Sequence, residues 1–311
     1  MRGVVRGAIG ATLCLLMHAG FVAAQGAITL LAGNQDPAEI GAAVEAFERE
    51  HPDIDVTLVL EAWDTVDDKF VTMVAAGEPP DVFINNSVYG WAKYAYQGLF
   101  QDLTPLVRRD AASLRWNEFF EPAIEQSKIG GTLYGMPAGP ATGFATTYNA
   151  TLFREAGLQA PPTDWSDPAW DWDAMVAAAK KLTEVGPDGR ATQYGVDFWD
   201  ADGPLLAMAY AYGGDWFDPA SYRDGVVHEV TLASPENARA YQAVADLRIK
   251  DAVRPGGPLG GVGGGIDNFG GGRIAMWLEV VQYNPRTFTP AAQFEWGFAP
   301  FPFPEGSARD R

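Results

Sequence analysis

The first part of the chain alternates short apolar runs with segments in which apolar residues recur every three or four positions. The runs are typical of buried strands, and the second spacing places side chains along one helix face. The predicted strands are 28–32, 54–60 and 81–84. The predicted helix faces carry Ile40, Val44 and Phe47, then Phe70, Met73 and Val74. This order predicts a parallel sheet with right-handed crossovers.

The ends of these two helices are also marked in the sequence. Residues 36–39 read Asp-Pro-Ala-Glu, which offers an N-cap, a proline at the first helical position and an acid three residues after the cap. Thr65 and Asp68 have the spacing of a second capping box. We expect Gly77 to follow the end of this helix as a C′ residue.

The rest of the chain predicts a second α/β unit. Its predicted strands are 144–148, 194–199, 273–278 and 294–301, and its predicted helices begin after Asp171, at Pro204 and after Ser234. A chain of 311 residues is longer than one compact core usually needs. We therefore expect an N-terminal lobe at 25–137 and a C-terminal lobe at 138–311, joined near 134–139.

Residues 1–24 have the features of an export signal. Arg2 and Arg6 precede an apolar stretch, and residues 22–24 place small side chains at positions −3 and −1 of a cleavage site. A membrane anchor is the alternative interpretation, but the run is short and contains His18. We expect cleavage after Ala24 and export of the mature chain.

Charge and cysteine content exclude several classes of partner. Lys+Arg 22 against Asp+Glu 40 gives a net charge of −18, and such a surface would repel nucleic acid. The single cysteine, Cys14, lies inside the predicted signal without a lipobox before it, so we expect no lipid anchor, no disulfide and a periplasmic location. His51 and His228 lack metal-ligand spacing. We expect neither a metal site nor a cofactor.

Polar side chains follow the predicted strands of the N-terminal lobe. Ligands of open parallel sheets bind beyond the carboxyl ends of the strands. Amides and carboxylates there can pair with sugar hydroxyls, while an indole ring covers the C–H face of the sugar. The candidate ligand residues are Asn34, Gln35, Trp63, Asp64, Asn85, Asn86 and Ser87. Each has a structural alternative, because Asp64 and residues 85–87 can also serve as helix caps or turns.

Tryptophans supply most candidates in the C-terminal lobe. The chain has ten of them, and most are expected to pack in cores. Those that follow a predicted strand or a Gly-Gly turn are candidates for ligand contact, and Trp63 and Trp199 are the preferred stacking residues. The candidates of this lobe and of the connection before it are Gly139, Trp199, Asp200, Trp216, Trp277 and Glu279.

Seven stretches in a fixed order carry a family resemblance. They are 47–54, 75–82, 98–104, 134–137 with 147–149, 152–158, 269–276 and 296–300. With them the chain resembles the family 1 extracellular solute-binding proteins, the sugar-binding, maltose-binding-protein-like components of ABC importers. Members of this family continue beyond the segment that matches 296–300, so this chain, which ends at Arg311, is expected to be truncated at its C-terminus.

The resemblance implies a fold, an activity and a partner. The implied fold is the α/β, two-lobed periplasmic-binding-protein fold of class II, in which each lobe is a sheet flanked by helices and the ligand cleft lies between the lobes. The implied activity is capture of a mono- or oligosaccharide by hinge bending, without catalysis. The implied partner is an ABC transporter permease in the membrane, and the implied oligomeric state is a monomer.

Two other functions remain open from the residues alone. One is a binding protein for a polyamine or another small solute, and a polyamine site would combine aromatic rings with carboxylates. The other is a secreted glycan hydrolase, which would need two carboxylates across a cleft. Asp64, Asp200 and Glu279 can be assigned to either role. The glycine-rich stretch 255–272 lacks the Gly-Lys-Ser/Thr ending of a phosphate-binding loop, so we interpret it as a flexible loop.

Overall fold

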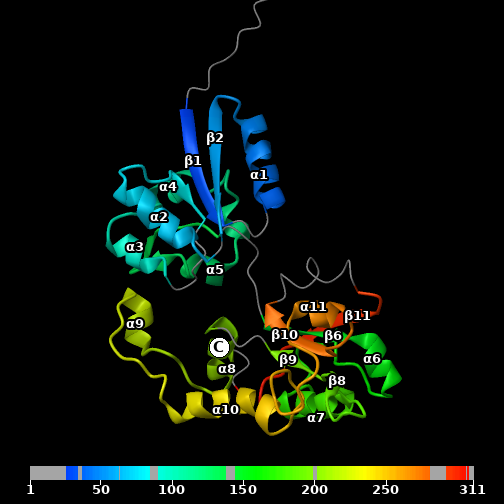
Figure 1. Ribbon diagram of the computed structural model, residues 1–311. Coiled ribbons are helices and arrows are strands. Elements are labelled where there is room, and N and C mark those ends of the chain that lie inside the picture. The colour runs from blue at the N-terminus through cyan, green and yellow to red at the C-terminus, as the bar shows by residue number, and fades with distance from the viewer. Residues whose placement is uncertain are drawn as a thin grey trace, which may run out of the picture. The chain divides into compact units, whose positions relative to one another are not determined.

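The computed structural model describes residues 26–33, 37–62, 64–84, 90–137, 144–198, 202–280, 292–305 and 307. The predicted export signal lies outside these ranges. The chain divides into two units, Met1–Leu99 and Phe100–Arg311, and each is described by itself (Figure 1). Residues 100–137 thus group with the second unit, while the lobe boundary that we expect at 137–138 stays a prediction.

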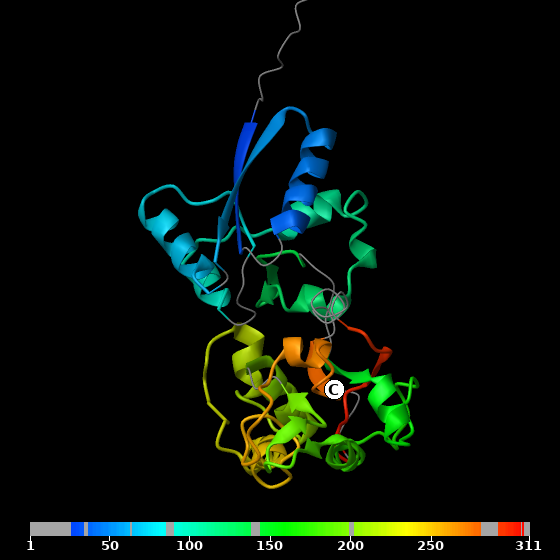
Figure 2. The same cartoon turned by 45° about the vertical axis from the view of Figure 1, so that its right-hand side comes forward.

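The first unit is built on a three-stranded parallel sheet. Its strands are β1 (Gly26–Gly33), β2 (Ile54–Glu61) and β3 (Val82–Phe83), in the order β2-β1-β3. Its helices are α1 (Pro37–Glu50), α2 (Val66–Ala75) and α3 (Ala92–Tyr96). The predicted alternation of strands and helices is confirmed. Figure 2 shows α1 running along β2, with which it is in contact.

The core of the first unit lies toward the carboxyl ends of its strands. Leu31 and Ala32 are fully buried, whereas the first residues of β1 are exposed. The rings of Phe70 and Phe83 stack with their centroids 4.5 Å apart, and Tyr94 meets Phe70 edge-on at 4.8 Å. In α1, by contrast, no residue is fully buried. The helix predicted from its apolar spacing is present, but its face is only partly covered.

The two ends of α2 depart differently from the sequence prediction. Thr65 does not cap the helix, because its backbone is already helical and its hydroxyl donates to Glu61 Oε1 at 3.1 Å and to the carbonyl of Ala62 at 3.3 Å. The predicted capping box is therefore wrong. Gly77 has a φ of 79°, and its N–H donates to the carbonyl of Val74 at 3.0 Å. The predicted glycine C′ residue is confirmed.

The second unit begins with a small cluster of helices and a hairpin. The elements are α4 (Thr104–Asp110), the 3₁₀ helix η1 (Trp116–Glu118), α5 (Glu121–Glu125), β4 (Lys128–Ile129) and β5 (Thr132–Leu133). Val107, Ile124 and Leu133 form a separate hydrophobic cluster within this part. The hydroxyl of Thr104 accepts the N–H of Leu133 at 3.0 Å and so joins α4 to the hairpin.

A four-stranded mixed sheet follows. Its strands are β6 (Phe144–Asn149), β9 (Asp197–Phe198), β10 (Met276–Val280) and β11 (Trp296–Pro300), in the order β11-β6-β10-β9. β6 is antiparallel to both of its neighbours, and β9 is parallel to β10. The predicted strand at 194–199 is much shorter in the structure, because Tyr194 makes only an isolated bridge to Ile274 before β9 begins.

Helices cover both faces of this sheet (Figure 1). The helices of this part of the chain are α6 (Ala150–Glu155), α7 (Trp172–Leu182), α8 (Asp202–Ala211), α9 (Pro219–Asp224), α10 (Pro235–Ile249) and α11 (Ile266–Gly270), with a short hairpin of β7 (Glu184–Val185) and β8 (Ala191–Gln193). Of these helices, α9 lies apart from the sheet in Figure 1. Alternate residues of β10 point to opposite faces. Met276 and Leu278 join the large core with α7 and α10, whereas Trp277 joins a smaller cluster with Phe269 of α11.

The helix starts predicted after Asp171 and after Ser234 are confirmed, whereas α8 begins at Asp202, two residues before the start predicted at Pro204. The carboxylate of Asp171 accepts the N–H of Ala174 at 2.8 Å, and the hydroxyl of Ser234 accepts that of Asn237 at 3.2 Å. Both are N-cap bonds of the expected type. Among the residues that the structure describes, no helix combines the length and apolar character needed to cross a bilayer.

Candidate functional site

The carboxyl ends of the first sheet lie together. Gly33 of β1 is aligned with Glu61 of β2, and Phe83 at the end of β3 is aligned with Leu31. The segments that leave these strands therefore start from one edge of the sheet. Most of the candidates that follow lie outside the described residues: Asn34, Gln35, Trp63, Asn85, Asn86 and Ser87.

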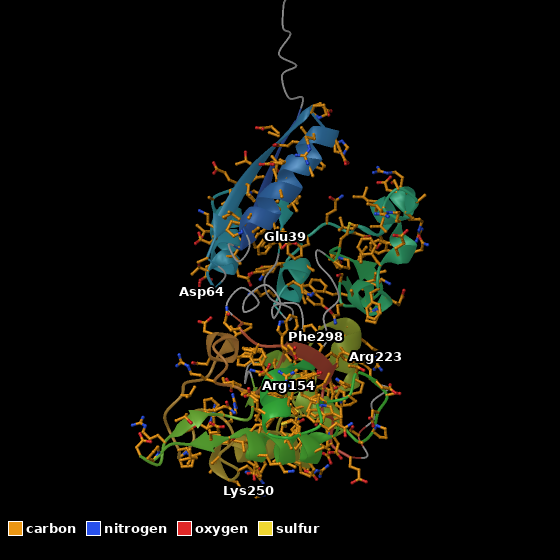
Figure 3. The ribbon with its side chains drawn as sticks, turned by 90° about the vertical axis from the view of Figure 1, so that its right-hand side faces the viewer. Glu39, Asp64, Arg154, Arg223, Lys250 and Phe298 are labelled. Carbon is orange, nitrogen blue, oxygen red and sulfur yellow. The ribbon has the colours of Figure 1, made fainter. Side chains whose placement is uncertain are left out.

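Asp64 is the one candidate of this edge that the structure describes. It is exposed and lies in the turn that leads into α2 (Figure 3). The helix N-cap position belongs to Thr65, so Asp64 is not the N-cap residue. Glu61, the last residue of β2, accepts the N–H of Ala62 at 3.0 Å and the hydroxyl of Thr65. Its carboxylate thereby fixes the turn that presents Asp64.

In the second unit, β9 and β10 also end at a common edge, because they are parallel neighbours. Trp199 and Asp200 come directly after β9 in the sequence and lie outside the described residues, as does Gly139. Glu279 lies in β10 with its backbone paired to Ala145, and its side chain is not described. Trp277 is only 5% exposed and packs against Phe269 and Ile274, so most of its ring serves the core.

A buried ion pair stands at the carboxyl end of β9. Arg254 Nε donates to Asp197 Oδ1 at 3.0 Å, and both residues are almost fully buried. The second guanidinium branch of Arg254 donates to the carbonyl of Phe198. Asp197 also accepts two backbone N–H groups, from Phe198 and Gly265, each at 2.9 Å. Such satisfaction of both charges is what makes a buried ion pair tolerable.

The same ion pair lines a cavity. The cavity has a volume of about 310 Å³, and its walls include Arg248, Trp277 and several glycines of the stretch 256–265. The chain as a whole carries a charge of −18, whereas the charged residues that line this cavity are two arginines and one aspartate. The charge of the cavity is therefore opposite in sign to that of the whole chain. The sequence analysis missed Asp197 and Arg254. The only sequence signal was a lone arginine just before the glycine-rich stretch.

Trp216 lies elsewhere in the second unit. It follows the end of α8 in the sequence. The ten residues of this helix span roughly 15 Å and separate Trp216 from the segment after β9. Its indole N–H donates to the hydroxyl of Tyr241 at 2.5 Å, and its backbone N–H donates to Asp215 Oδ1 at 2.6 Å. The ring is therefore held by partners within the unit. Contact of Trp216 with a ligand stays a prediction.

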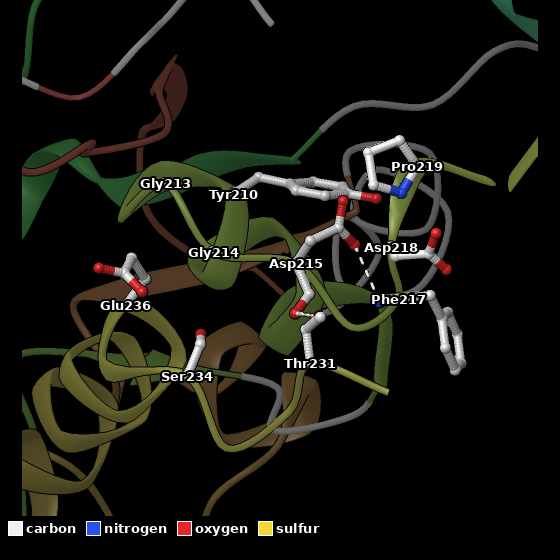
Figure 4. Close-up of a pocket in the computed structure, with 10 residues that line it drawn as sticks. All are labelled: Tyr210, Gly213, Gly214, Asp215, Phe217, Asp218, Pro219, Thr231, Ser234 and Glu236. Atoms are coloured by element: carbon white, nitrogen blue, oxygen red, sulfur yellow. Dashed lines mark hydrogen bonds between the residues drawn. The ribbon is translucent and has the colours of Figure 1, made fainter. Parts of the chain in front are cut away.

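Asp215, the residue before Trp216 in the sequence, lines a second hollow of about 560 Å³ (Figure 4). Its carboxylate accepts the hydroxyl of Tyr222, which in turn accepts the hydroxyl of Tyr210 at 3.5 Å. Burial, followed by the hydrogen bond to Asp215, raises the pKa of Tyr222 far above its usual range. Burial also raises the pKa of Tyr210. Both phenols therefore stay protonated at neutral pH and act as donors.

The backbone around this hollow is fixed from several sides. The carbonyl of Asp215 accepts the hydroxyl of Thr231 at 2.7 Å and the side-chain N–H of Asn237 at 2.6 Å. The carboxylate of Asp218 caps α9, and the hydrogen bond from the Ser221 hydroxyl is the main cause that lowers the pKa of Asp218. In the parts of the chain that the structure describes, no group of three or more His, Cys, Asp and Glu side chains is arranged to hold a metal ion.

Several known proteins are similar to this chain. A mannitol-binding protein from Pseudomonas aeruginosa is 24% identical over 265 residues, which are 83% of this chain and 56% of that protein. A substrate-binding protein of an ABC system from Listeria monocytogenes, solved in complex with cycloalternan, superposes with a TM-score of 0.73 at 25% identity and covers 91% of this chain and 68% of its own. A receptor from Streptomyces glaucescens, solved with acarbose, gives a TM-score of 0.69 at 22% identity and the same coverage of 91% and 68%.

These similarities bear on fold and family. The chain spans only 54–60% of the length of the curated relatives it matches. It has the α/β fold of the two-lobed periplasmic binding proteins, so the fold class expected from the sequence is confirmed. The family model for bacterial extracellular solute-binding proteins matches residues 32–309. The chain therefore belongs to the family of bacterial extracellular solute-binding proteins.

Proposed function

We propose that this protein captures a carbohydrate outside the cytoplasm and delivers it to the permease of an ABC importer. The observation that carries the proposal is the family match over residues 32–309. Relatives and structural neighbours described as binding mannitol, cycloalternan and acarbose support a polyhydroxylated ligand. The family consists of binding proteins, which supports capture without chemical conversion of the ligand.

The proposed ligand contacts are those at the carboxyl edges of the two sheets. In the first unit the alignment of Gly33 with Glu61 supports a shared edge for the candidates that follow β1 and β2. The exposed carboxylate of Asp64 is available to accept sugar hydroxyls there. In the second unit we assign ligand contact to Trp199, which directly follows β9, and to Asp200. The indole would cover the apolar face of a sugar ring.

Export and partners belong to the same proposal. The family name places its members outside the cytoplasm, and residues 1–24 would supply the export signal. A membrane permease is the proposed partner, since capture alone would not bring the ligand into the cell. We propose that the protein acts as a monomer without cofactor or metal.

Ligand-dependent stabilisation of the whole chain tests the proposal. The protein is heated with mannitol, maltose, cycloalternan, acarbose and, as the cationic alternative, spermidine. A ligand present at one hundred times its Kd stabilises the folded state by about 2.7 kcal/mol, which raises the Tm by several degrees. A shift with a sugar or polyol supports the proposal. A shift with spermidine alone that disappears in high salt would replace it with polyamine binding.

Calorimetric titration of variants then tests the assigned residues. Trp199→Ala is expected to weaken sugar binding about tenfold or more, because one stacked aromatic ring contributes on the order of 1 kcal/mol or more. The matched control is Trp165→Ala, which removes an indole that is 57% exposed in the same unit. Equal affinities for the two variants would remove Trp199 from the site. Release of a cleaved product from an oligosaccharide ligand would show that the protein is a hydrolase.

A further inference from the structure

We propose that Arg254 and Asp197 are positioning residues that set ligand affinity by fixing the carboxyl end of β9. This inference rests on the proposed function, because it concerns the affinity of the same site. It adds two residues that contact no ligand in the proposal and that act through the backbone. Asp197 and Phe198 are the last two residues before the chain leaves the sheet.

The geometry joins three separate parts of the chain at this point. Arg254 precedes the glycine-rich stretch, Asp197 belongs to β9, and Gly265 precedes α11. The guanidinium binds the carboxylate of Asp197 and the carbonyl of Phe198 at the same time. The carboxylate then accepts the N–H groups of Phe198 and Gly265. Both the carbonyl and the N–H of Phe198 are thus held by this one pair, so the backbone of Phe198 cannot rotate without breaking it.

Close packing leaves this arrangement little freedom. A Cβ atom on Gly264 would lie 2.8 Å from Asp197 Oδ2, so any side chain there would require the carboxylate of Asp197 to move. The N–H of Val196 donates to the carbonyl of Val253 at 3.2 Å, so the residues before the pair are tied together as well. The guanidinium carbon of Arg254 lies 5.8 Å from the centre of the Phe198 ring. The backbone at the carboxyl end of β9 is therefore held by residues more than fifty positions later in the sequence.

A buried ion pair adds little net stability to a fold, because both charges must be removed from water. Well-packed apolar residues of similar volume often stabilise a fold equally well. It does give directional bonds, and these are what a binding site requires of its supporting residues. Such supporting partners typically change affinity about tenfold to a hundredfold when they are removed from metal sites. We expect an effect of the same kind here, with a size of about tenfold, because the backbone rather than a ligand atom is displaced.

The test compares ligand affinity with stability in matched variants. Arg254→Met keeps the length of the stem but removes the guanidinium, Arg254→Lys keeps the charge, and Gly264→Ala disturbs Asp197 from the opposite side. The control is Met175→Ala, which removes a fully buried side chain from α7. Kd is measured by calorimetry at a temperature where every variant is folded, with the sugar that shifts the Tm of the unmodified chain most.

We expect Arg254→Met and Gly264→Ala to raise Kd about tenfold, Arg254→Lys to raise it less, and Met175→Ala to lower the Tm while leaving Kd unchanged. Amide hydrogen exchange supplies a readout that needs no ligand. The amides of Phe198 and Gly265 should exchange faster in Arg254→Met than in Met175→Ala, because they donate to Asp197.

Equal Kd values for Arg254→Met and the unmodified chain would overturn the positioning role while leaving the proposed function intact. The role would also fall if Kd followed the loss of Tm equally in Met175→Ala, since the effect would then be general destabilisation. Failure of the unmodified chain to bind any sugar would overturn the proposed function and this affinity role together. Unchanged exchange at Phe198 and Gly265 would show that the pair does not hold the strand end.

Discussion

The two units of the molecule differ in how completely they bury their apolar residues. In the second unit, Met276 and Leu278 of β10 and Ala299 of β11 are fully buried in the large core that also contains residues of α7 and α10. In the described part of the first unit, β1 is buried only toward its carboxyl end, and α1 has no fully buried residue. Phe47 of α1 is 37% exposed, and Leu60 of β2 is 38% exposed. Helices and strands of the second unit should therefore contribute more to the free energy of unfolding than those of the first unit.

Burial of apolar surface is the main favourable contribution to folding. The second unit should consequently resist unfolding better than the first, and a side chain removed from it should cost more. The difference also teaches that a helix can be recognised from its pattern without being well packed. Amphipathic spacing reports which face a helix offers to a partner, and burial then depends on what lies opposite.

The largest expected contrast concerns glycine. A Cβ on Gly195 would lie 2.0 Å from the carbonyl oxygen of Ala179, so Gly195→Ala should prevent stable folding of the second unit. A Cβ on Gly41 of α1 would have no atom within 4 Å apart from its two chain neighbours and the nearby backbone of its own helix. Gly41→Ala should stabilise the first unit by about 0.5–1 kcal/mol, because alanine favours the helix. Urea unfolding followed by hydrogen exchange in each unit measures both effects.

A loss of stability in Gly41→Ala similar to that in Gly195→Ala would contradict the comparison. It would mean that α1 is as closely packed as the interior of the second unit. A stable, fully folded Gly195→Ala protein would show instead that the close approach of α7 to Gly195 can relax.

The next contrast uses phenylalanine in both units. Phe153 of α6 is only 1% exposed and belongs to the large core, so Phe153→Ala should destabilise by about 3–5 kcal/mol. Phe47→Ala removes a ring that is partly in water and should cost less than about 1.5 kcal/mol. Denaturant midpoints and slopes of the two variants check the difference. Similar costs would indicate that the two units are equally well packed.

Helix caps provide a smaller contrast of the same kind. The carboxylate of Asp171 accepts the N–H of Ala174, and Asp171→Ala should destabilise α7 by about 1 kcal/mol. Thr65 has no capping bond in α2, so Thr65→Ala should cost only a few tenths of a kcal/mol. Amide exchange in the first turn of each helix measures the effect locally. An equal effect at both helices would show that Thr65 caps α2 in solution.

The sequence predicted elements well where the signal was local. The strands at 28–32, 54–60 and 144–148 and the caps at Asp171 and Ser234 depend on neighbouring residues, and the structure confirms them. Thr65 shows the limit of such reasoning. Thr65 has the correct spacing, but its hydroxyl donates to Glu61 at the end of β2 and makes no capping bond. Spacing does not reveal which of two available partners a hydroxyl chooses.

Long-range contacts account for what the sequence could not show. The glycine-rich stretch 255–272 was interpreted as a flexible loop, yet a Cβ on Gly261 would lie 2.1 Å from the carbonyl of Ala191 and one on Gly257 would lie 2.2 Å from that of Arg248. These glycines allow close packing against β8 and α10. Likewise, the pairing of Asp197 with Arg254 links residues far apart in the chain. The candidate site residues followed from strand ends alone, and most of them lie outside the described residues.

The smallest expected effect is a pH dependence in the second unit. The hydrogen bond from the Ser221 hydroxyl, with smaller contributions from backbone N–H groups, lowers the pKa of Asp218. A carboxyl group whose pKa is lower in the folded state stabilises the protein above its unfolded pKa of about 3.9. This stabilisation is lost as the pH falls from that value through the folded pKa. Acid should therefore weaken the start of α9.

Asp218→Asn isolates this contribution, because asparagine can still accept the cap hydrogen bonds but does not titrate near neutral or acid pH. The unfolding free energy of the variant should fall less than that of the unmodified chain between pH 5 and pH 2, as measured by urea titration at several pH values. Ser221→Ala removes the main cause of the lowered pKa and should flatten the dependence in the same direction. If both variants lost stability in acid as steeply as the unmodified chain, the acid sensitivity of the second unit would have to come from carboxylates elsewhere, such as Asp224, whose pKa is lowered mainly by its hydrogen bond to His228.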